Sequence, residues 1–179
     1  MLQKLKNFLS LFKLSNPKKK SSNKKIFLPD EISGNEKIIR AVYSPINLHK
    51  NGKKVNNSFY KPRAGEDEIS VNRLDYTTPV FLKNLAKYFE NTKERRSYFG
   101  FSLLKSSEIE DSGLRTVYSP LTEPIDNPYH ADIKIDYIVE KGVQLPSEIS
   151  HKIKNITIKS RFYSDPNPES EEWNGDKLI

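Results

Sequence analysis

The segment from His130 to Tyr137 alternates apolar and polar side chains without exception, and this pattern constrains the fold more than any other feature of the chain. Successive side chains of a β-strand point to opposite faces, so period-two alternation predicts a strand with one buried and one solvent-facing side. The buried face would carry Ala131, Ile133, Ile135 and Tyr137. The solvent-facing side would carry His130, Asp132, Lys134 and Asp136.

Further strands and helices follow from local pattern along the rest of the chain. Apolar and β-branched runs predict strands over 37–43, 69–74, 98–104 and 116–119, and Gly100 inside the third run predicts a bulge or a close backbone approach. Thr78-Pro79 predicts the start of a helix that ends near Asn91, and Pro146 opens a second helix expected to continue through Tyr163. Because strands and helices are mixed rather than regularly alternating, we expect an α+β fold: a single domain with a mainly antiparallel sheet and about two packed helices.

The charge of the chain is concentrated at its beginning. The first 25 residues hold eight lysines and no acidic residue, whereas residues 26–179 hold 22 basic and 23 acidic residues. Apolar residues at three- and four-residue spacing predict an amphipathic helix over 2–14, which Pro17 would end. We therefore expect an amphipathic basic N-terminal arm and linker (1–25), an α+β domain (26–164) and an acidic tail (165–179).

Composition excludes several classes of protein. The chain has no cysteine, which excludes disulfides, thiolate metal sites and thiol nucleophiles. No apolar run approaches the roughly 20 residues of a membrane span. The sequence contains no phosphate-binding P-loop, dinucleotide fingerprint, nucleophile elbow or paired-histidine zinc motif. We expect a cytoplasmic protein and assign neither a cofactor nor a metal ion.

Two sets of residues in the body are candidates for chemistry or binding. His130 and Asp132 share one face of the alternating strand and could act as a base and its orienting acid, although a polar solvent face explains the same pattern. Arg95 and Arg96 follow the first helix in a polar loop and suit phosphate or carboxylate recognition. Arg73 has apolar neighbours, so we expect it to form a structural clamp with a carboxylate.

Three phrases in the body resemble a small uncharacterised bacterial family. They are Ser70-Val71-Asn72-Arg73-Leu74-Asp75-Tyr76, His130-Ala131-Asp132-Ile133 and Arg161-Phe162-Tyr163-Ser164-Asp165-Pro166-Asn167-Pro168. The resemblance covers residues 38–175 and implies an accessory domain to which this chain adds a basic leader. It transfers no catalytic residue.

These observations predict a non-enzymatic accessory protein that docks on a nucleic-acid or nucleoprotein partner, as in bacterial or phage defence. The arm residues expected to make the contact are Lys4, Leu5, Lys6, Phe8, Leu9, Phe12, Lys18, Lys19, Lys20, Lys24 and Lys25. One alternative is a small nuclease or nucleotide-modifying toxin that uses His130 and Asp132. A second is a peripheral membrane protein whose arm lies on anionic lipid, and the opposite charges of arm and tail also permit self-association.

Overall fold

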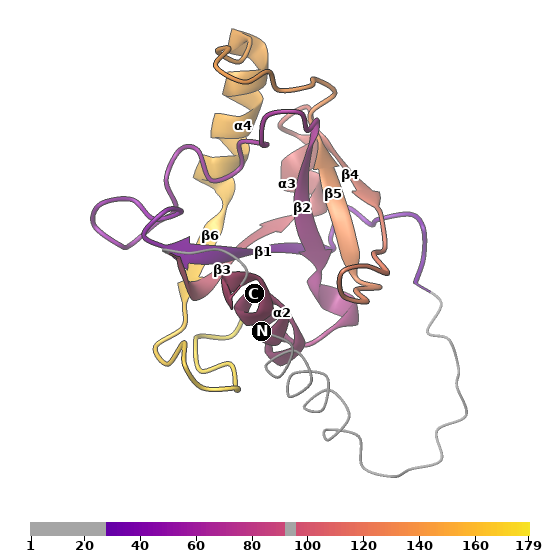
Figure 1. Cartoon of the computed structure of the whole chain (residues 1–179). Coiled ribbons are helices and arrows are strands. Elements are labelled where there is room, and N and C mark those ends of the chain that lie inside the picture. Colours follow the sequence, from indigo (N-terminus) through magenta and orange to yellow (C-terminus); the bar gives the residue numbers. More distant parts are fainter. Residues whose placement is uncertain (1–27, 92–95) are drawn as a thin grey trace.

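A computed structural model describes residues 28–91 and 96–179, and these form an α+β domain around one antiparallel sheet (Figure 1). The strands are β1 (Lys37–Ser44), β2 (Glu68–Arg73), β3 (Ser97–Lys105), β4 (Arg115–Tyr118), β5 (His130–Lys134) and β6 (Arg161–Ser164). The helices are the 3-10 turn η1 (Leu74–Tyr76), α2 (Pro79–Asn91), α3 (Ser106–Glu110) and α4 (Ser147–Lys159). The strand order is β4-β5-β2-β1-β3-β6, and every neighbouring pair is antiparallel. The expected fold class is confirmed.

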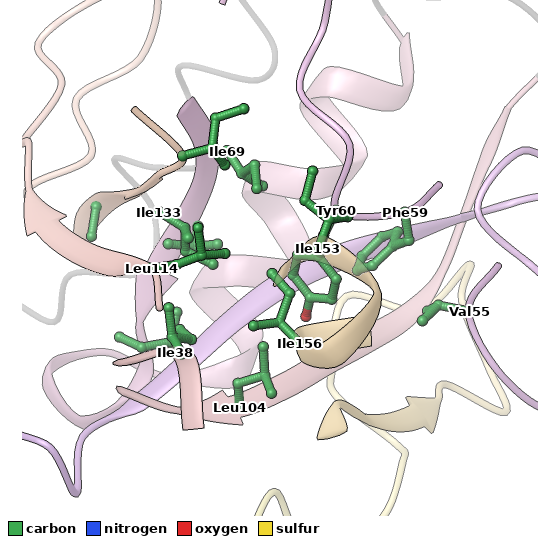
Figure 2. Packing of buried hydrophobic residues seen from close by; sticks show 14 of the residues in the cluster. Ile38, Val55, Phe59, Tyr60, Ile69, Leu104, Leu114, Ile133, Ile153 and Ile156 are labelled. Carbon is green, nitrogen blue, oxygen red and sulfur yellow. The ribbon is translucent and has the colours of Figure 1, made fainter. Parts of the chain in front are cut away.

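Both faces of the sheet are covered, because apolar residues point alternately to each side. Ile38 and Ile39 are consecutive on β1, yet both are buried. Ile38 belongs to a cluster with Ile153 and Ile156 of α4, which Figure 2 shows together with Leu104 and Ile133 from the strands. On the opposite face, Ile39 packs in a second cluster with α2 residues, including Leu82 and Ala86. Burial of each such aliphatic side chain contributes about 1.5–3 kcal/mol.

Several local predictions are confirmed at their boundaries. α2 begins at Pro79, and the Thr78 hydroxyl accepts a hydrogen bond from the Phe81 amide at 3.2 Å, as a capping residue does. Gly100 has φ +154°, and a Cβ at this position would lie 2.2 Å from the Tyr163 carbonyl oxygen of β6. The glycine therefore permits the close approach of two strands.

The prediction of a solvent face on the alternating segment is wrong for its first two polar residues. His130 and Asp132 are 6% and 4% exposed, because β5 lies inside the sheet between β4 and β2 and the chain after β4 packs over them. The strand is also shorter than expected, since it ends at Lys134 and Asp136 takes a positive φ of 51°. The other two polar residues of the segment do not share the surroundings of His130 and Asp132. Lys134 contacts Glu68, and Asp136 forms an ion pair with Arg115.

The last helix also ends earlier than its pattern predicts. α4 stops at Lys159, Ser160 is extended, and Arg161–Ser164 forms β6 on the edge of β3. Pairing with β3 satisfies the backbone groups of this segment within the sheet, and this tertiary interaction outweighs local helix preference.

Arg73 forms the expected clamp, with Glu36 as its carboxylate. The guanidinium is fully buried and donates to the two Glu36 oxygens at 2.5 and 3.0 Å. It also donates to the carbonyl of Pro29 and lies against the rings of Tyr76 and Tyr118. Arg73 therefore fastens the start of the domain to the sheet.

The residues of the predicted acidic tail pack on the domain. Asp165 is buried and forms an ion pair of 2.7 Å with buried Lys83 of α2, Trp173 packs on Phe101, and Leu178 is buried. The predicted arm, residues 1–25, lies outside the described residues. Among the described helices, none is long and apolar enough to cross a membrane.

Candidate functional site

The sheet opens between its two central strands. β1 pairs with β2 only through Ile38 with Arg73 and Ile39 with Asn72, whereas β1 pairs with β3 along its whole length. β2 continues beside β5 from Asn72 back to Glu68. Residues 40–44 of β1 therefore leave β2, and Figure 1 shows the two strands running in clearly different directions. We call the space between them the notch.

A pocket of about 690 Å³ occupies the notch. Its floor is formed by β1, β2 and β5, and its walls come from α2, the 45–63 segment and the 121–127 segment. The volume lies in the range of about 300–1,000 Å³ that is typical of small-molecule sites. The notch is therefore a candidate binding site created by strand divergence.

Arg40 lies where the strands separate. Its Nη1 donates to the Phe59 carbonyl at 2.8 Å, and its guanidinium lies 5.0 Å from the centre of the Phe59 ring. Burial lowers the pKa of Arg40 to about 10, so the side chain remains charged at neutral pH. Within the described part of the chain, no carboxylate forms an ion pair with it. A half-buried guanidinium with unused donors is an anion-binding group.

Three more cationic side chains line the notch pocket. Lys61 and Arg63 come from the 45–63 segment and are exposed, and Arg63 makes one long ion pair with Glu66 at 3.8 Å. Arg96 lies over the Tyr43 ring at 4.2 Å and donates to the Phe89 carbonyl. The described residues that line the pocket include no aspartate or glutamate. The lining thus has four positive charges, and Glu66, which pairs with Arg63, lies outside it, so the net field of the pocket attracts anions.

The floor on the side of β2 and β5 is polar and contains no lysine, arginine, aspartate or glutamate in its described lining. Ser70, Asn72, Asn127 and His130 line it. Asn72 and His130 are direct cross-strand partners, and the Asn127 amide donates to the Asn72 side-chain oxygen at 2.8 Å. The pocket therefore has a cationic part and a neutral polar part.

His130 and Asp132 lie together with Ser119 behind this neutral part. His130 Nδ1 is 2.7 Å from the Ser119 carbonyl oxygen, which can only accept, so the proton lies on Nδ1. The Ser119 hydroxyl donates to Asp132 Oδ2. His130 Nε2 and Asp132 Oδ1 are 3.8 Å apart, enclosed, and without a hydrogen-bond partner among the described residues.

The pKa of Asp132 is raised by its burial, although the hydrogen bond from Ser119 opposes the shift. A bound ligand would contact the ring of His130 as part of the wall, but Nε2 and Oδ1 have almost no exposed surface. The enclosure of both atoms favours a proton held inside the protein, on the Asp132 carboxyl group, over a base that reacts with a ligand.

The sequence-based site predictions have three outcomes. The structure brings His130 and Asp132 together and places Arg96 in the pocket wall. Arg95 and all the arm residues lie outside the described residues. Sequence reasoning misses Arg40, Lys61, Arg63 and Asn72, and the only signal for Arg40 is a charged residue inside an apolar strand pattern.

No protein-family model, curated protein or solved structure matches the chain.

Proposed function

We propose that this protein is a non-enzymatic accessory protein that docks on a nucleic-acid or nucleoprotein partner, with the notch pocket receiving a phosphate of that partner. The observation that carries the proposal is Arg40, a half-buried guanidinium without a carboxylate partner in the described chain, in a pocket lined by three further cations and no acid. Arginine donors in a fixed fork match phosphate oxygens, and desolvation strengthens the interaction.

The distribution of charge supports a phosphate-bearing partner. The eight lysines of residues 1–25 supply charge outside the pocket, and such charges attract a nucleic-acid backbone without reading its sequence. The pocket then supplies a localised contact that general charge attraction lacks. A cytoplasmic location and a role in bacterial or phage defence belong to the same proposal.

The test compares two arginines in one binding assay. Fluorescence anisotropy measures how the full chain binds a short 5′-phosphorylated single-stranded DNA at several salt concentrations. Arg40→Gln removes a charge-assisted contact, so affinity falls by about tenfold or more, and the slope of log K against log salt shrinks by about 0.7.

Arg115→Gln is the matched control. Arg115 is an exposed side chain on β4 that pairs with Asp136 and does not line the pocket, so the substitution removes the same charge elsewhere. Its affinity should stay within about twofold of the wild type. Equal losses of affinity in the two variants would show that net charge alone drives binding, and they would contradict a phosphate site in the pocket.

The enzymatic alternative, a small nuclease or nucleotide-modifying toxin, rests on the position of His130 in the pocket wall beside Asp132. It predicts that His130→Ala abolishes turnover of a nucleic acid or nucleotide while the melting temperature is retained. The peripheral-membrane alternative rests on the arm and predicts retention of the full chain by anionic vesicles without nucleic acid.

A further inference from the structure

The notch pocket is much larger than a phosphate group, and its polar groups are segregated. Phosphate would occupy a small part of about 690 Å³. Along β1, the neutral part lies beside Ile39, which pairs with Asn72; the cationic part begins at the next residue, Arg40, and extends to Arg96, which lies over Tyr43 four residues beyond Ile39. At about 3.3 Å per residue, the far end of the cationic part, at Tyr43, is about 13 Å from Ile39. The ligand that fills both parts therefore carries an anionic end and a neutral polar end.

The neutral part offers unused hydrogen-bond donors. The Tyr129 amide donates to the Asn127 side-chain oxygen, so the Asn127 NH₂ group is the donor to the Asn72 oxygen. This chain of hydrogen bonds fixes the orientation of Asn72, whose own NH₂ group has no partner among the described residues. Ser70 is exposed, lies two residues away on the same face of β2, and also has no protein partner in this part of the chain.

Apolar side chains complete the pocket beside these donors. Leu82 and Leu85 of α2 and Leu121 and Ile125 of the 121–127 segment line it. Apolar walls with a few oriented donors suit a flat heteroaromatic ring whose edge carries acceptors. A sugar alone would leave the apolar walls uncovered.

From these features we infer that the notch pocket binds one nucleotide unit, with its phosphate among Arg40, Lys61, Arg63 and Arg96 and its base against Ser70 and Asn72. A single nucleotide, extended from phosphate to base edge, has a length comparable with the span of the two parts. The inference rests on the proposed function and names its ligand class. The unit is either a free nucleotide or the terminal nucleotide of a single strand.

Calorimetry on the full chain separates the contributions of phosphate and base. The probes are inorganic phosphate, ribose 5-phosphate and the four common nucleoside 5′-monophosphates. At least one monophosphate should bind roughly tenfold more tightly than ribose 5-phosphate, because base contacts add to those of the phosphate.

Two variants assign the base end. Asn72→Leu keeps the side-chain shape and removes its donors, together with the oxygen that accepts from Asn127, and Ser70→Ala changes an exposed side chain whose hydroxyl has no hydrogen-bond partner among the described residues. Each should reduce the preference for the monophosphate over ribose 5-phosphate while leaving the affinity for inorganic phosphate within about twofold of the wild type. Arg40→Gln should weaken every probe.

The outcomes distinguish this inference from the proposed function. If phosphate binding depends on Arg40 but no monophosphate exceeds ribose 5-phosphate, the nucleotide assignment is overturned and the phosphate site stands. If no phosphate-bearing probe binds, both fail. Competition by a 5′-phosphorylated oligonucleotide, but not by its unphosphorylated form, identifies a strand end as the source of the nucleotide; binding of a free nucleotide without such competition identifies the soluble pool.

Discussion

At the scale of single residues, the buried side chains of His130 and Asp132 lack a hydrogen atom that could be donated from one to the other. Nδ1 of His130 and the Ser119 hydroxyl use their protons on other acceptors, so Nε2 and Oδ1 face each other as two lone pairs at 3.8 Å. Enclosed acceptors without a donor cost free energy. A proton on Asp132 relieves this cost, in agreement with the raised pKa of its carboxyl group.

Because of this missing hydrogen, we expect the free energy of unfolding to depend on pH through the ionisation of Asp132. The folded-state pKa of Asp132 lies above its unfolded value, mainly because of burial, so the folded state binds the proton more tightly. The contribution of Asp132 to the free energy of unfolding therefore falls as pH rises from the unfolded pKa, about 3.9, through the folded pKa. Ser119, His130, Glu68 and Lys134 are the groups whose hydrogen bonds or charges act on it.

Asp132→Asn tests this proton assignment, because its amide nitrogen, in the place of Oδ1, can donate an N–H toward His130 Nε2 while its oxygen still accepts from Ser119. Urea unfolding from pH 4 to 7 should show a smaller loss of stability with rising pH than the wild type shows. At pH 7 the variant should be as stable as the wild type or more stable by up to about 1 kcal/mol. If the variant is less stable than the wild type at pH 7 and its pH profile is unchanged, the folded state does not hold the missing proton on Asp132.

Residue-level chemistry is only partly predictable from the sequence. The Arg73 clamp is predictable because its neighbours are apolar and an inward arginine needs a carboxylate, but its partner Glu36 is 37 residues away and no local pattern indicates it. Arg40 is not predictable as a site residue, because its importance depends on β1 leaving β2 beside it, which is a tertiary property.

At the scale of elements, β6 depends on one glycine. Gly100 permits the Tyr163 carbonyl to approach where a Cβ would lie 2.2 Å from it. Gly142 also has a positive φ, +80°, but its added Cβ would meet nothing within 4 Å. A substitution at Gly142 therefore tests backbone strain alone, whereas a substitution at Gly100 tests backbone strain together with steric overlap.

Alanine at each position should have different effects. Gly142→Ala costs about 1–2 kcal/mol, which is the backbone penalty alone. Gly100→Ala adds an overpacking cost of about 1–3 kcal/mol and displaces β6. Denaturant unfolding gives the two free energies, and hydrogen exchange at the amides of β6 reports the displacement. Equal costs, with β6 still protected from exchange, would contradict the close approach.

Element boundaries are predictable where local chemistry decides them. Thr78 and Pro79 specify the start of α2, and Gly100 indicates a close strand contact because a glycine interrupts an otherwise apolar strand pattern. The end of α4 and the existence of β6 are not predictable in this way, because Arg161–Ser164 is extended only through pairing with β3, which is far away in sequence.

At the scale of the whole molecule, the charge is distributed over three parts of the chain. Residues 1–25 carry eight lysines, the tail packs on α2 and β3, and the notch gathers four cations without an acid in its described lining. The sequence shows the first part directly. No local pattern in the sequence indicates the cations of the notch, because they come from three separate segments that meet only where the sheet opens.

The central claim, that a phosphate enters the notch, is tested most directly by NMR of the arginine Nε–Hε groups in the full chain. The chain is titrated with 5′-phosphorylated single-stranded DNA. We predict saturable shifts of the Arg40 and Arg96 signals, with those of Arg115 and Arg161 unchanged. Shifts confined to backbone amides of residues 1–25, with the Arg40 signal unmoved at saturation, would place binding on the arm alone and contradict the notch as the site.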